Sequence, residues 1–444
     1  MREMKDSGIE WVGHIPFSWD VKPIRAKFRE VTEKNKLGIE KNALKFTYGN
    51  IVKKENFDAA DDDYVANTIL NYMVVNPGTI MLNGLNLNFD FVTQRVALVK
   101  ERGIITSAYI AFAPILDDDI STQFFTYLLK AYDSCKAFHN MGGGVRKILN
   151  FAELKKQYIV YPTITEQKRI ANFLDAKCAE IDALTADIQT QIDTLEQYKR
   201  SVITEAVTKG LNPDVEMKDS GIEWIGKIPV SWSFPKITHI LDYSHPYPIG
   251  DGDHGSIKST EYKDEGIPFI RVQNLGFATE LNLENIVYIS ESQNETIKNS
   301  SLFPGDVLFA KTGATIGKVG IVPKEIQIAN TTSHVGKITV SRDINSKFVF
   351  YVLASYVGYK QFWDIAAQKS TRPELSIDEI KTIHVLLPQT IEEQIEIVAY
   401  LDAKCIQIDG AIQNKKEQVV TLDEYKKSLI YEYVTGKKEV PENA

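Results

Sequence analysis

A sixteen-residue segment occurs twice in this chain, and a long helical segment also occurs twice. Residues 4–19 read Met-Lys-Asp-Ser-Gly-Ile-Glu-Trp-Val-Gly-His-Ile-Pro-Phe-Ser-Trp and return at residues 217–232 with three differences. The second repeat pairs residues 164–208 with residues 391–435. Solenoid repeats are much shorter than these and number at least three. The chain is therefore expected to be one large unit duplicated, in the order variable region, shared helix, variable region, shared helix.

The shared segment has the sequence of a long helix. Between Thr165 and Thr208 there is neither glycine nor proline, and strong helix formers dominate. Apolar residues recur there every seven positions, which is typical of a coiled coil. These seam residues are Leu174, Ile181, Ile188, Leu195 and Val202 in the first copy, and Leu401, Ile408, Leu422 and Leu429 in the second. Because so long a seam needs a partner, we expect the two copies to pair; two unrelated core helices are the alternative.

The variable regions combine short β-type runs with later helical stretches. Runs such as residues 79–82, 94–99, 266–272, 306–310 and 318–322 are bounded by glycine, proline or asparagine. Residues 121–137 and 347–367 then turn helical, and Pro-Gly pairs at residues 77–78 and 304–305 sit at equivalent places. Each region therefore fits an α+β globule. The fold class we expect is α+β, with two such globules and the two long helices paired with each other.

Composition restricts the setting of the protein more than its function. The three cysteines of the 444-residue chain cannot form a disulfide framework, and no CxxC pair suggests zinc. No run of about 18 apolar residues could span a bilayer, and residues 1–6 are too polar for a signal peptide. We expect a soluble, cytoplasmic protein. The net charge of −8 disfavours a nucleic-acid binder, but a local basic face can lie on an acidic molecule.

Catalytic patterns are missing from the sequence. Residues 313–318 resemble a phosphate-binding loop but have three residues between the glycines instead of four, and Val319 follows the lysine. Residues 251–255 lack the spacing of a calcium loop and are expected to form a polar turn. There is no HExxH pair, no Asn-Pro-Pro-aromatic tetrapeptide and no G-x-S-x-G elbow. We therefore expect neither a catalytic site nor a metal site in this chain.

Polar loops in both variable regions are instead suited to binding. Asn and Gln side chains pair with adenine edges in the major groove of DNA, and Arg and Lys pair with guanine. The candidate DNA-binding residues are Asn83, Asn86, Asn88, Arg146 and Lys147 in the first region, and Arg271, Gln273, Asn274, Lys311, Thr312, Lys318 and Arg372 in the second. Arg146 and Arg372 stand at equivalent positions before the two shared helices. Ordinary solvated loops are the alternative for each of them.

With both repeats in view, nearly the whole chain resembles the specificity (S) subunit of a type I restriction–modification system. The repeated Ser-Gly-Ile-Glu-Trp motif is one basis of the resemblance, and the starts of the helices at residues 164–167 and 391–394 are another. Residues 271–274, 311–313 and 317–318 also resemble parts of one type of target-recognition domain. The first region departs from that type, because it has Asn83-Gly84 where the second has Lys311-Thr312-Gly313.

The resemblance implies two target-recognition domains held apart by two antiparallel conserved helices, with an internal pseudo-two-fold. The implied boundaries are 1–163 for the first domain, 164–210 for the first helix, 211–389 for the second domain, 390–436 for the second helix and 437–444 for a tail. It further implies that each domain reads one half of an interrupted, asymmetric double-stranded DNA target, with helix length fixing the unread spacer.

The family also implies partner chains and a non-catalytic role. Two methyltransferase (modification) subunits would dock on the conserved helices, and two restriction subunits would join them. S-adenosylmethionine, ATP and magnesium are expected in those partners and not in this chain. A type II specificity subunit of the same architecture is the nearest alternative. A coiled-coil interaction scaffold without a DNA role is a second, and a fused methyltransferase or nuclease conflicts with the missing motifs.

Overall fold

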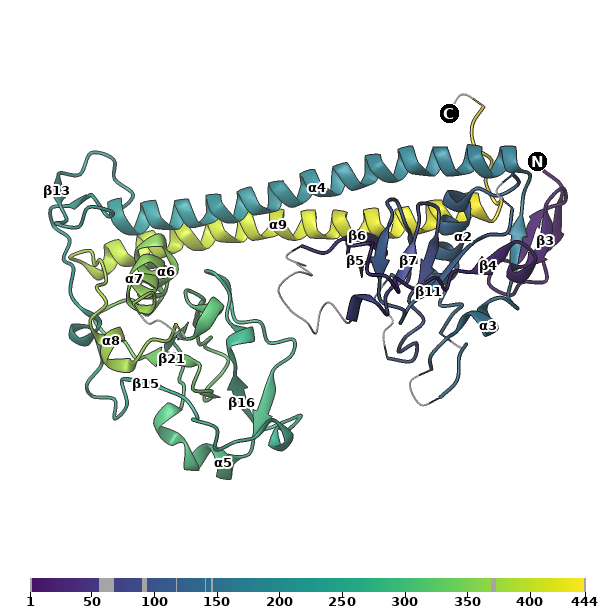
Figure 1. Ribbon diagram of the computed structural model, residues 1–444. Coiled ribbons are helices and arrows are strands. Elements are labelled where there is room, and N and C mark those ends of the chain that lie inside the picture. The colour runs from purple at the N-terminus through teal and green to yellow at the C-terminus, as the bar shows by residue number, and fades with distance from the viewer. Residues whose placement is uncertain are drawn as a thin grey trace. The chain divides into compact units, whose positions relative to one another are not determined.

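The computed structural model describes residues 2–55, 68–89, 94–116, 118–139, 141–144, 147–368 and 373–442. The chain divides into two compact units. Unit 1 comprises Met1–Ile188 and Glu417–Ala444, and unit 2 comprises Gln189–Lys416. Two long helices, α4 (Ile164–Lys209) and α9 (Ile391–Val434), each contribute one part to unit 1 and the other to unit 2 (Figure 1).

Four antiparallel strands in the order β4-β11-β8-β9 form the central sheet of unit 1. These strands are β4 (Phe28–Glu30), β8 (Ile80–Leu82), β9 (Val96–Leu98) and β11 (Ile110–Pro114). The smaller pairs are formed by β5 (Leu44–Thr47) with β6 (Asn50–Lys53), and by β7 (Met73–Val75) with β10 (Gly103–Ile105). Helix α2 (Thr122–Ser134) supplies Phe124, Phe125 and Leu128 to the core, and α3 (Phe151–Leu154) follows it.

Unit 2 has the same central sheet. Its four antiparallel strands follow the order β15-β21-β18-β19. They are β15 (Ile249–Asp251), β18 (Val307–Ala310), β19 (Val319–Ile321) and β21 (Val335–Ile338). A second sheet contains β16 (Ile267–Ile270), β17 (Val287–Ile289) and β20 (Asn330–Thr331). The helices are α5 (Glu291–Thr296), α6 (Ser346–Ala354), α7 (Tyr356–Ala366) and α8 (Ile377–Lys381).

The two Pro-Gly pairs occupy the same turn in the two units. Gly78 and Gly305 precede β8 and β18, and both have a positive φ, 87° and 89°. Each donates its backbone N–H at 2.9 Å to the residue that follows the next strand, Val99 in unit 1 and Val322 in unit 2. Glycine adopts this backbone conformation without steric cost, which explains why it recurs here. The prediction that the divergent variable regions share an α+β fold is confirmed.

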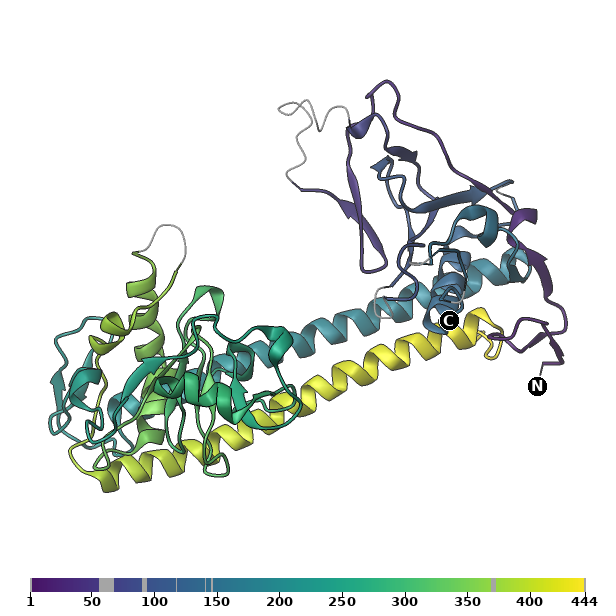
Figure 2. The ribbon, with the colours of Figure 1, turned by 90° about the horizontal axis from the view of Figure 1, so that it is seen from below.

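The long helices pair in opposite directions within each unit. In unit 1 the Phe173 ring lies 4.6 Å from the Tyr433 ring, and Asp182 pairs with Lys426 at 2.6 Å. In unit 2, Lys415 donates a hydrogen bond to Gln191. Farther along in the same unit, Lys199, which is only 4% exposed, pairs with Asp409 at 2.7 Å. In both units the α9 partner number falls as the α4 number rises, so the predicted antiparallel pairing is found in each (Figure 2).

The predicted seam faces inward along both helices. Leu174, Ile181 and Ile188 of α4 are buried, as are Leu401, Ile408 and Leu429 of α9. The other three seam residues, Leu195, Val202 and Leu422, are partly buried. Lys415, which interrupts the apolar pattern, finds its hydrogen-bond partner in Gln191. Burial of this stripe is the main force that holds two such long helices together.

The repeated sixteen-residue motif forms a hairpin that packs at the start of a long helix. In unit 1 the hairpin consists of β1 (Met4–Asp6) and β2 (His14–Pro16), and in unit 2 of β13 (Met217–Asp219) and β14 (Lys227–Pro229). The last residue of the sixteen-residue motif is a buried tryptophan, which donates its indole N–H to a glutamate in the first turn of the long helix. The distances are 3.2 Å for Trp19 to Glu166 and 2.9 Å for Trp232 to Glu393. The motif therefore fixes where each helix begins.

Matching side chains also attach the shorter helices to the long ones. Tyr127 of α2 donates to Asp175 of α4 at 2.7 Å, and Tyr351 of α6 donates to Asp402 of α9 at 2.6 Å. Unit 1 adds a strand pair, β3 (Asp20–Pro23) with β12 (Tyr158–Tyr161), where unit 2 has isolated bridges. The matched helix cysteines, Cys178 and Cys405, are buried beside these tyrosines, and burial raises the pKa of both thiols. They behave as small core residues, as the sequence predicts.

Candidate nucleic-acid interface

The loops that carry the predicted contacts of unit 2 meet at one edge of its sheets. Strands β16 and β20 run parallel and end together, Ile270 beside Thr331. The end of β18 lies beside the start of β21, Ala310 opposite Val335, and the end of β15 reaches the same place. Backbone hydrogen bonds join the connections that follow, for example from Lys311 N to His334 O at 3.1 Å. We call residues 251–257, 271–276, 311–318, 332–334 and 373–374 the unit-2 loop edge.

The first loop of this edge presents two of its three predicted residues to solvent. Gln273 is exposed, and Arg271 is partly buried. Arg271 donates to Asn285 O at 2.7 Å and its guanidinium lies 5.7 Å from the Tyr262 ring. Asn274 differs, because it is only 2% exposed and both ends of its amide are used within the loop. The structure thus argues against Asn274 as a direct reader of bases; its amide holds the loop in shape.

Lys311 and Thr312 are also buried, contrary to the expectation that they contact DNA directly. The Lys311 ammonium lies 2.7 Å from Asp251 and 3.3 Å from Glu374, and 6% of its side chain is exposed. Thr312 is 8% exposed and shares a hydrogen bond of 3.3 Å with the His334 ring. A buried cation needs such partners, because desolvation of a charge is costly. Lys311 therefore positions two carboxylates at the edge and does not project from it.

Another predicted residue of unit 2, Lys318, lies in the turn between β18 and β19. Its side chain is partly buried. Its backbone closes the turn, since its carbonyl accepts from Ala310 N at 2.9 Å and its N–H donates to Thr315 O at 3.1 Å. The loop is thus an ordinary strand connection, and it places a lysine on the loop edge. The neighbouring residues 251–255 form the expected polar turn, in which Asp253 accepts from Gly255 N and Ser256 N.

In unit 1 the two predicted loops lie against each other at the equivalent edge. Leu87 N donates to Lys147 O at 3.2 Å, and Leu149 N donates to Gly84 O at 2.9 Å. Asn86 is exposed with a φ of 52°, while Asn83, Asn88 and Lys147 are partly buried. This loop follows β8, just as the loop at Lys311 follows β18. We call residues 48–49, 83–89 and 147–149 the unit-1 loop edge.

Two exposed aromatic residues at this edge were not among the residues that the sequence analysis selected. Tyr48, at the turn between β5 and β6, is 77% exposed, and Phe89 is 69% exposed. The turn lies against Gln94, which precedes β9, and an added side-chain carbon on Gly49 would come within 2.7 Å of the Gln94 Oε1. Large apolar side chains in solvent indicate a binding surface. Their position after strand ends was the only available signal.

A third missed residue, Arg95, shapes the unit-1 loop edge from inside. It is fully buried, and its guanidinium donates to the carbonyls of Asn83, Leu85 and Asn86 at 3.0, 2.8 and 3.5 Å. An arginine fork can bind several backbone oxygens at once, which a lysine cannot do as well. Arg95 is thus the internal support of the loop that carries three predicted contacts.

Two predicted residues, Arg146 and Arg372, lie outside the described residues. Their neighbours do reach the loop edges: Lys147 belongs to the unit-1 loop edge, and Glu374 pairs with Lys311 in unit 2. Over the described ranges, no group of three His, Cys, Asp or Glu side chains is arranged to hold a metal ion. Nor does any helix in those ranges have the length and apolar character needed to cross a membrane.

Comparison with known proteins follows the same division of the chain. A family model for the type I restriction modification DNA specificity domain matches residues 24–194 and 252–421. The specificity subunit of the type I restriction enzyme MjaVIII of Methanocaldococcus jannaschii is 26% identical over 366 residues, which cover 80% of this chain and 79% of the relative. The EcoBI specificity subunit of Escherichia coli is 29% identical over 315 residues, 67% of this chain and 63% of the relative.

A solved structure resembles the fold over nearly the whole chain. It comes from work on complex assembly and conformational transition of the type I R-M system, with a TM-score of 0.65 at 16% identity, covering 96% of this chain and 99% of that one. The family model matches well over half of the residues, and it matches them as two copies that fall on the two halves of the duplication. This chain therefore belongs to the family of type I restriction modification DNA specificity domains.

Proposed function

We propose that this chain recognises an interrupted, asymmetric DNA target, one half with the unit-1 loop edge and the other with the unit-2 loop edge. The observation that carries the proposal is that two units with the same sheet order place different polar loops at the same edge. Equal folds give two equivalent readers, and different loops give two different half-sites. The MjaVIII and EcoBI relatives are specificity subunits, which supports a role in recognition.

The exposed chemistry of both edges suits DNA. Unit 2 presents Gln273 and, partly, Arg271 and Lys318, and amides and cations of this kind read base edges or bind phosphates. Unit 1 presents Asn86, Tyr48 and Phe89, all exposed on the unit-1 loop edge. Such rings contact thymine methyl groups or stack on bases. Although the net charge is −8, these local contacts do not require a basic molecule overall.

Gln273→Ala is expected to weaken discrimination at one base pair of the unit-2 half-site by about 1–3 kcal/mol, because a bidentate amide contact to a base is lost. The measurement is a competition binding assay between the target and targets changed at single positions. Gln327→Ala is the matched control, because Gln327 is also exposed but lies at the opposite edge of unit 2, between β19 and β20. Equal specificity of the two variants would contradict the assignment of the loop edge.

We also propose that the exposed faces of α4 and α9 dock two modification subunits, to which two restriction subunits bind. Apolar side chains remain exposed on these helices: Leu184, Tyr198, Ile406, Val420 and Tyr425. Tyr198 and Tyr425 are equivalent positions of the repeat, with exposures of 52% and 55%. Large apolar residues in solvent on a paired helix are typical of an interface. S-adenosylmethionine, magnesium and ATP would then act in the partner chains.

The double variant Tyr198→Glu with Tyr425→Glu is expected to fold normally but not to assemble with the modification subunits. The reason is that each glutamate would bury a charge at its contact with a partner. Co-expression followed by mass measurement of the complex tests this. Gln189→Glu with Lys416→Glu, which changes two exposed helix positions to the same residue, serves as the control. Assembly of the tyrosine variant at wild-type stoichiometry would place the partners elsewhere.

A further inference from the structure

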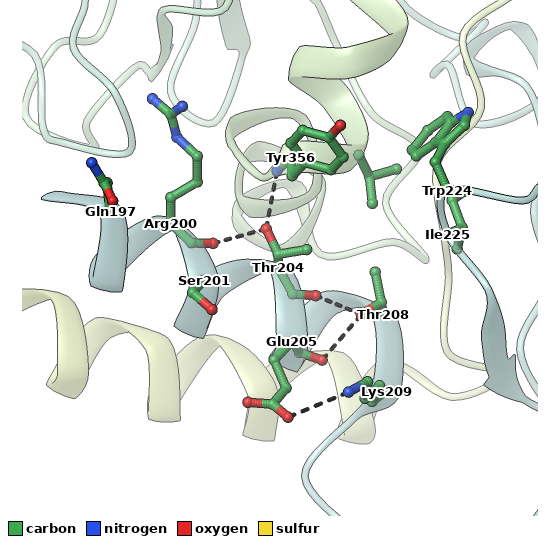
Figure 3. A pocket seen from close by; sticks show the side chains of 11 residues that line it. Gln197, Arg200, Ser201, Thr204, Glu205, Thr208, Lys209, Trp224, Ile225 and Tyr356 are labelled. Carbon is green, nitrogen blue, oxygen red and sulfur yellow. Dashed lines mark hydrogen bonds and ion pairs between the residues drawn. The ribbon is translucent and has the colours of Figure 1, made fainter. Parts of the chain in front are cut away.

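Unit 2 contains an open pocket beside the last turns of α4. It has a volume of about 490 Å³, and its walls come from α4, from the start of α7 and from the hairpin connection between β13 and β14 (Figure 3). Thr204 lies at its base and accepts a hydrogen bond of 3.0 Å from Tyr356 N. Trp224 and Tyr356 form an aromatic wall, with ring centroids 6.3 Å apart at 85°. Tyr356 is 41% exposed.

The equivalent place in unit 1 is filled by a side chain of the protein itself. The repeat aligns Thr204 with Tyr431 of α9. The Tyr431 hydroxyl donates to Trp11 O at 3.0 Å and to Val12 O at 3.3 Å. Trp11 packs edge-on against Tyr132 at 5.7 Å, as Trp224 does against Tyr356. Tyr132, however, is only 2% exposed.

Among the differences between the two sites, the one at the Thr204 position places a threonine in unit 2 where unit 1 has a tyrosine. Trp224 and Ile225, the counterparts of the two residues whose carbonyls bind Tyr431, both line it. A tyrosine ring from α9 closes the site in unit 1, and the short Thr204 side chain leaves it open in unit 2. Unit 1 thus shows a tyrosine ring at the place that corresponds to the pocket of unit 2.

We propose that the unit-2 pocket receives a tyrosine side chain from a partner polypeptide, in the manner in which unit 1 receives Tyr431. The occupant is an aromatic ring with a hydroxyl donor, because the wall is aromatic and tyrosine hydroxyls donate to carbonyl oxygens when buried. Glu205 and Lys209 form an ion pair of 3.5 Å at the rim of the pocket. These charged groups can hydrogen-bond to the polar groups of a polypeptide whose tyrosine enters the pocket. Tyrosine in a pocket is a frequent energetic anchor of interfaces. The partner would dock on unit 2 through a contact that unit 1 cannot offer.

The pocket itself is tested with p-cresol, the analogue of the tyrosine side chain, by ligand-observed NMR on the full chain. The wild-type protein is expected to give saturable binding, and Thr204→Tyr, which places in unit 2 the ring that unit 1 has, is expected to abolish it. Thr194→Tyr is the matched control, because Thr194 is exposed on α4 and does not line the pocket. Absence of p-cresol binding to the wild type, or binding to Thr204→Tyr equal to that of the wild type, overturns the proposal.

A reverse variant keeps the test decisive if Thr204→Tyr fails to fold. Tyr431→Thr removes the ring from unit 1 and is expected to add a second p-cresol site; an unchanged stoichiometry would show that the two places are not equivalent. The identity of the partner rests on the proposed function, so the last arm uses the co-expressed modification subunit. Thr204→Tyr is expected to weaken that assembly and Thr194→Tyr to leave it intact. Failure of the wild type to assemble would count against the proposed function, whereas equal assembly of Thr204→Tyr and wild type would reject the pocket as a docking site.

Discussion

Arg95→Met is expected to lower the free energy of unfolding of unit 1 by about 3–5 kcal/mol and to abolish reading of one DNA half-site. Arg95 is fully buried, and its guanidinium supports three carbonyls of the loop after β8. Methionine fills similar space but donates nothing, so these carbonyls lose their partners in a place that excludes water. Denaturant unfolding measures the stability, and amide hydrogen exchange measures the order of residues 83–89.

The effect on recognition should be confined to one half of the target. Arg95 belongs to unit 1, where it supports the loop after β8, so the half-site read by unit 2 should still be selected. Arg102→Met is the control, because the Arg102 side chain is 53% exposed and pairs with Glu40 at the surface of the same unit. Unchanged reading of both half-sites by Arg95→Met would show that the loop after β8 does not touch DNA.

The architecture could be predicted from the sequence because it depends on repetition and periodicity. The duplicated segments revealed the two units, and the seven-residue recurrence of Leu and Ile indicated the paired helices. The Pro-Gly pairs were sufficient to suggest a shared fold, since a turn with a positive φ tolerates few other residues. Strands β8, β9, β16, β18 and β19 all lie within the predicted runs.

The roles of single polar residues were much harder to predict. The sequence does not show whether a lysine in a loop reaches solvent or is buried between two carboxylates, as Lys311 is. Asn274 likewise satisfies its amide within its own loop. The contacts of Lys311 are distant in sequence, and those of Asn274 depend on the exact course of its loop, so no residue pattern reveals either. Arg95 was missed for a different reason. It lies within a β-type run, and nothing in the sequence indicates that its side chain supports the adjacent loop.

The same reasoning explains why the pocket in unit 2 escaped the sequence. Thr204 and Tyr431 are one of many pairs that differ between the two helix copies, and a difference between threonine and tyrosine on a partly exposed face has no meaning alone. Only the hydrogen bonds of Tyr431 to Trp11 and Val12 show that its ring completes a site. Internal duplication thus provides an internal control, because each unit shows what the other lacks.

Deleting one heptad from each long helix is expected to shorten the unread spacer of the proposed DNA target by about 3 base pairs. Removal of residues 187–193 and 414–420 shortens each helix by about 10 Å at 1.5 Å per residue, and base pairs rise about 3.4 Å. The apolar seam keeps its register because a whole heptad is removed from both. The pairs Lys199–Asp409 and Asp182–Lys426 remain. Long-read methylome sequencing of cells that express the variant with its partner genes gives the new spacer.

The control must separate helix length from the contacts that the deletion removes. Gln191 and Lys415, which are hydrogen-bonded to each other, both lie in the deleted heptads. Gln191→Ala with Lys415→Ala loses that contact at full length, so its spacer should equal that of the wild type. A shorter spacer also rotates one half-site relative to the other about the DNA axis. We expect DNA deformation to compensate for this rotation, which weakens binding, while helix length still determines the spacer. A deletion variant that methylates the wild-type spacer would show that the paired helices do not set the distance between the half-sites.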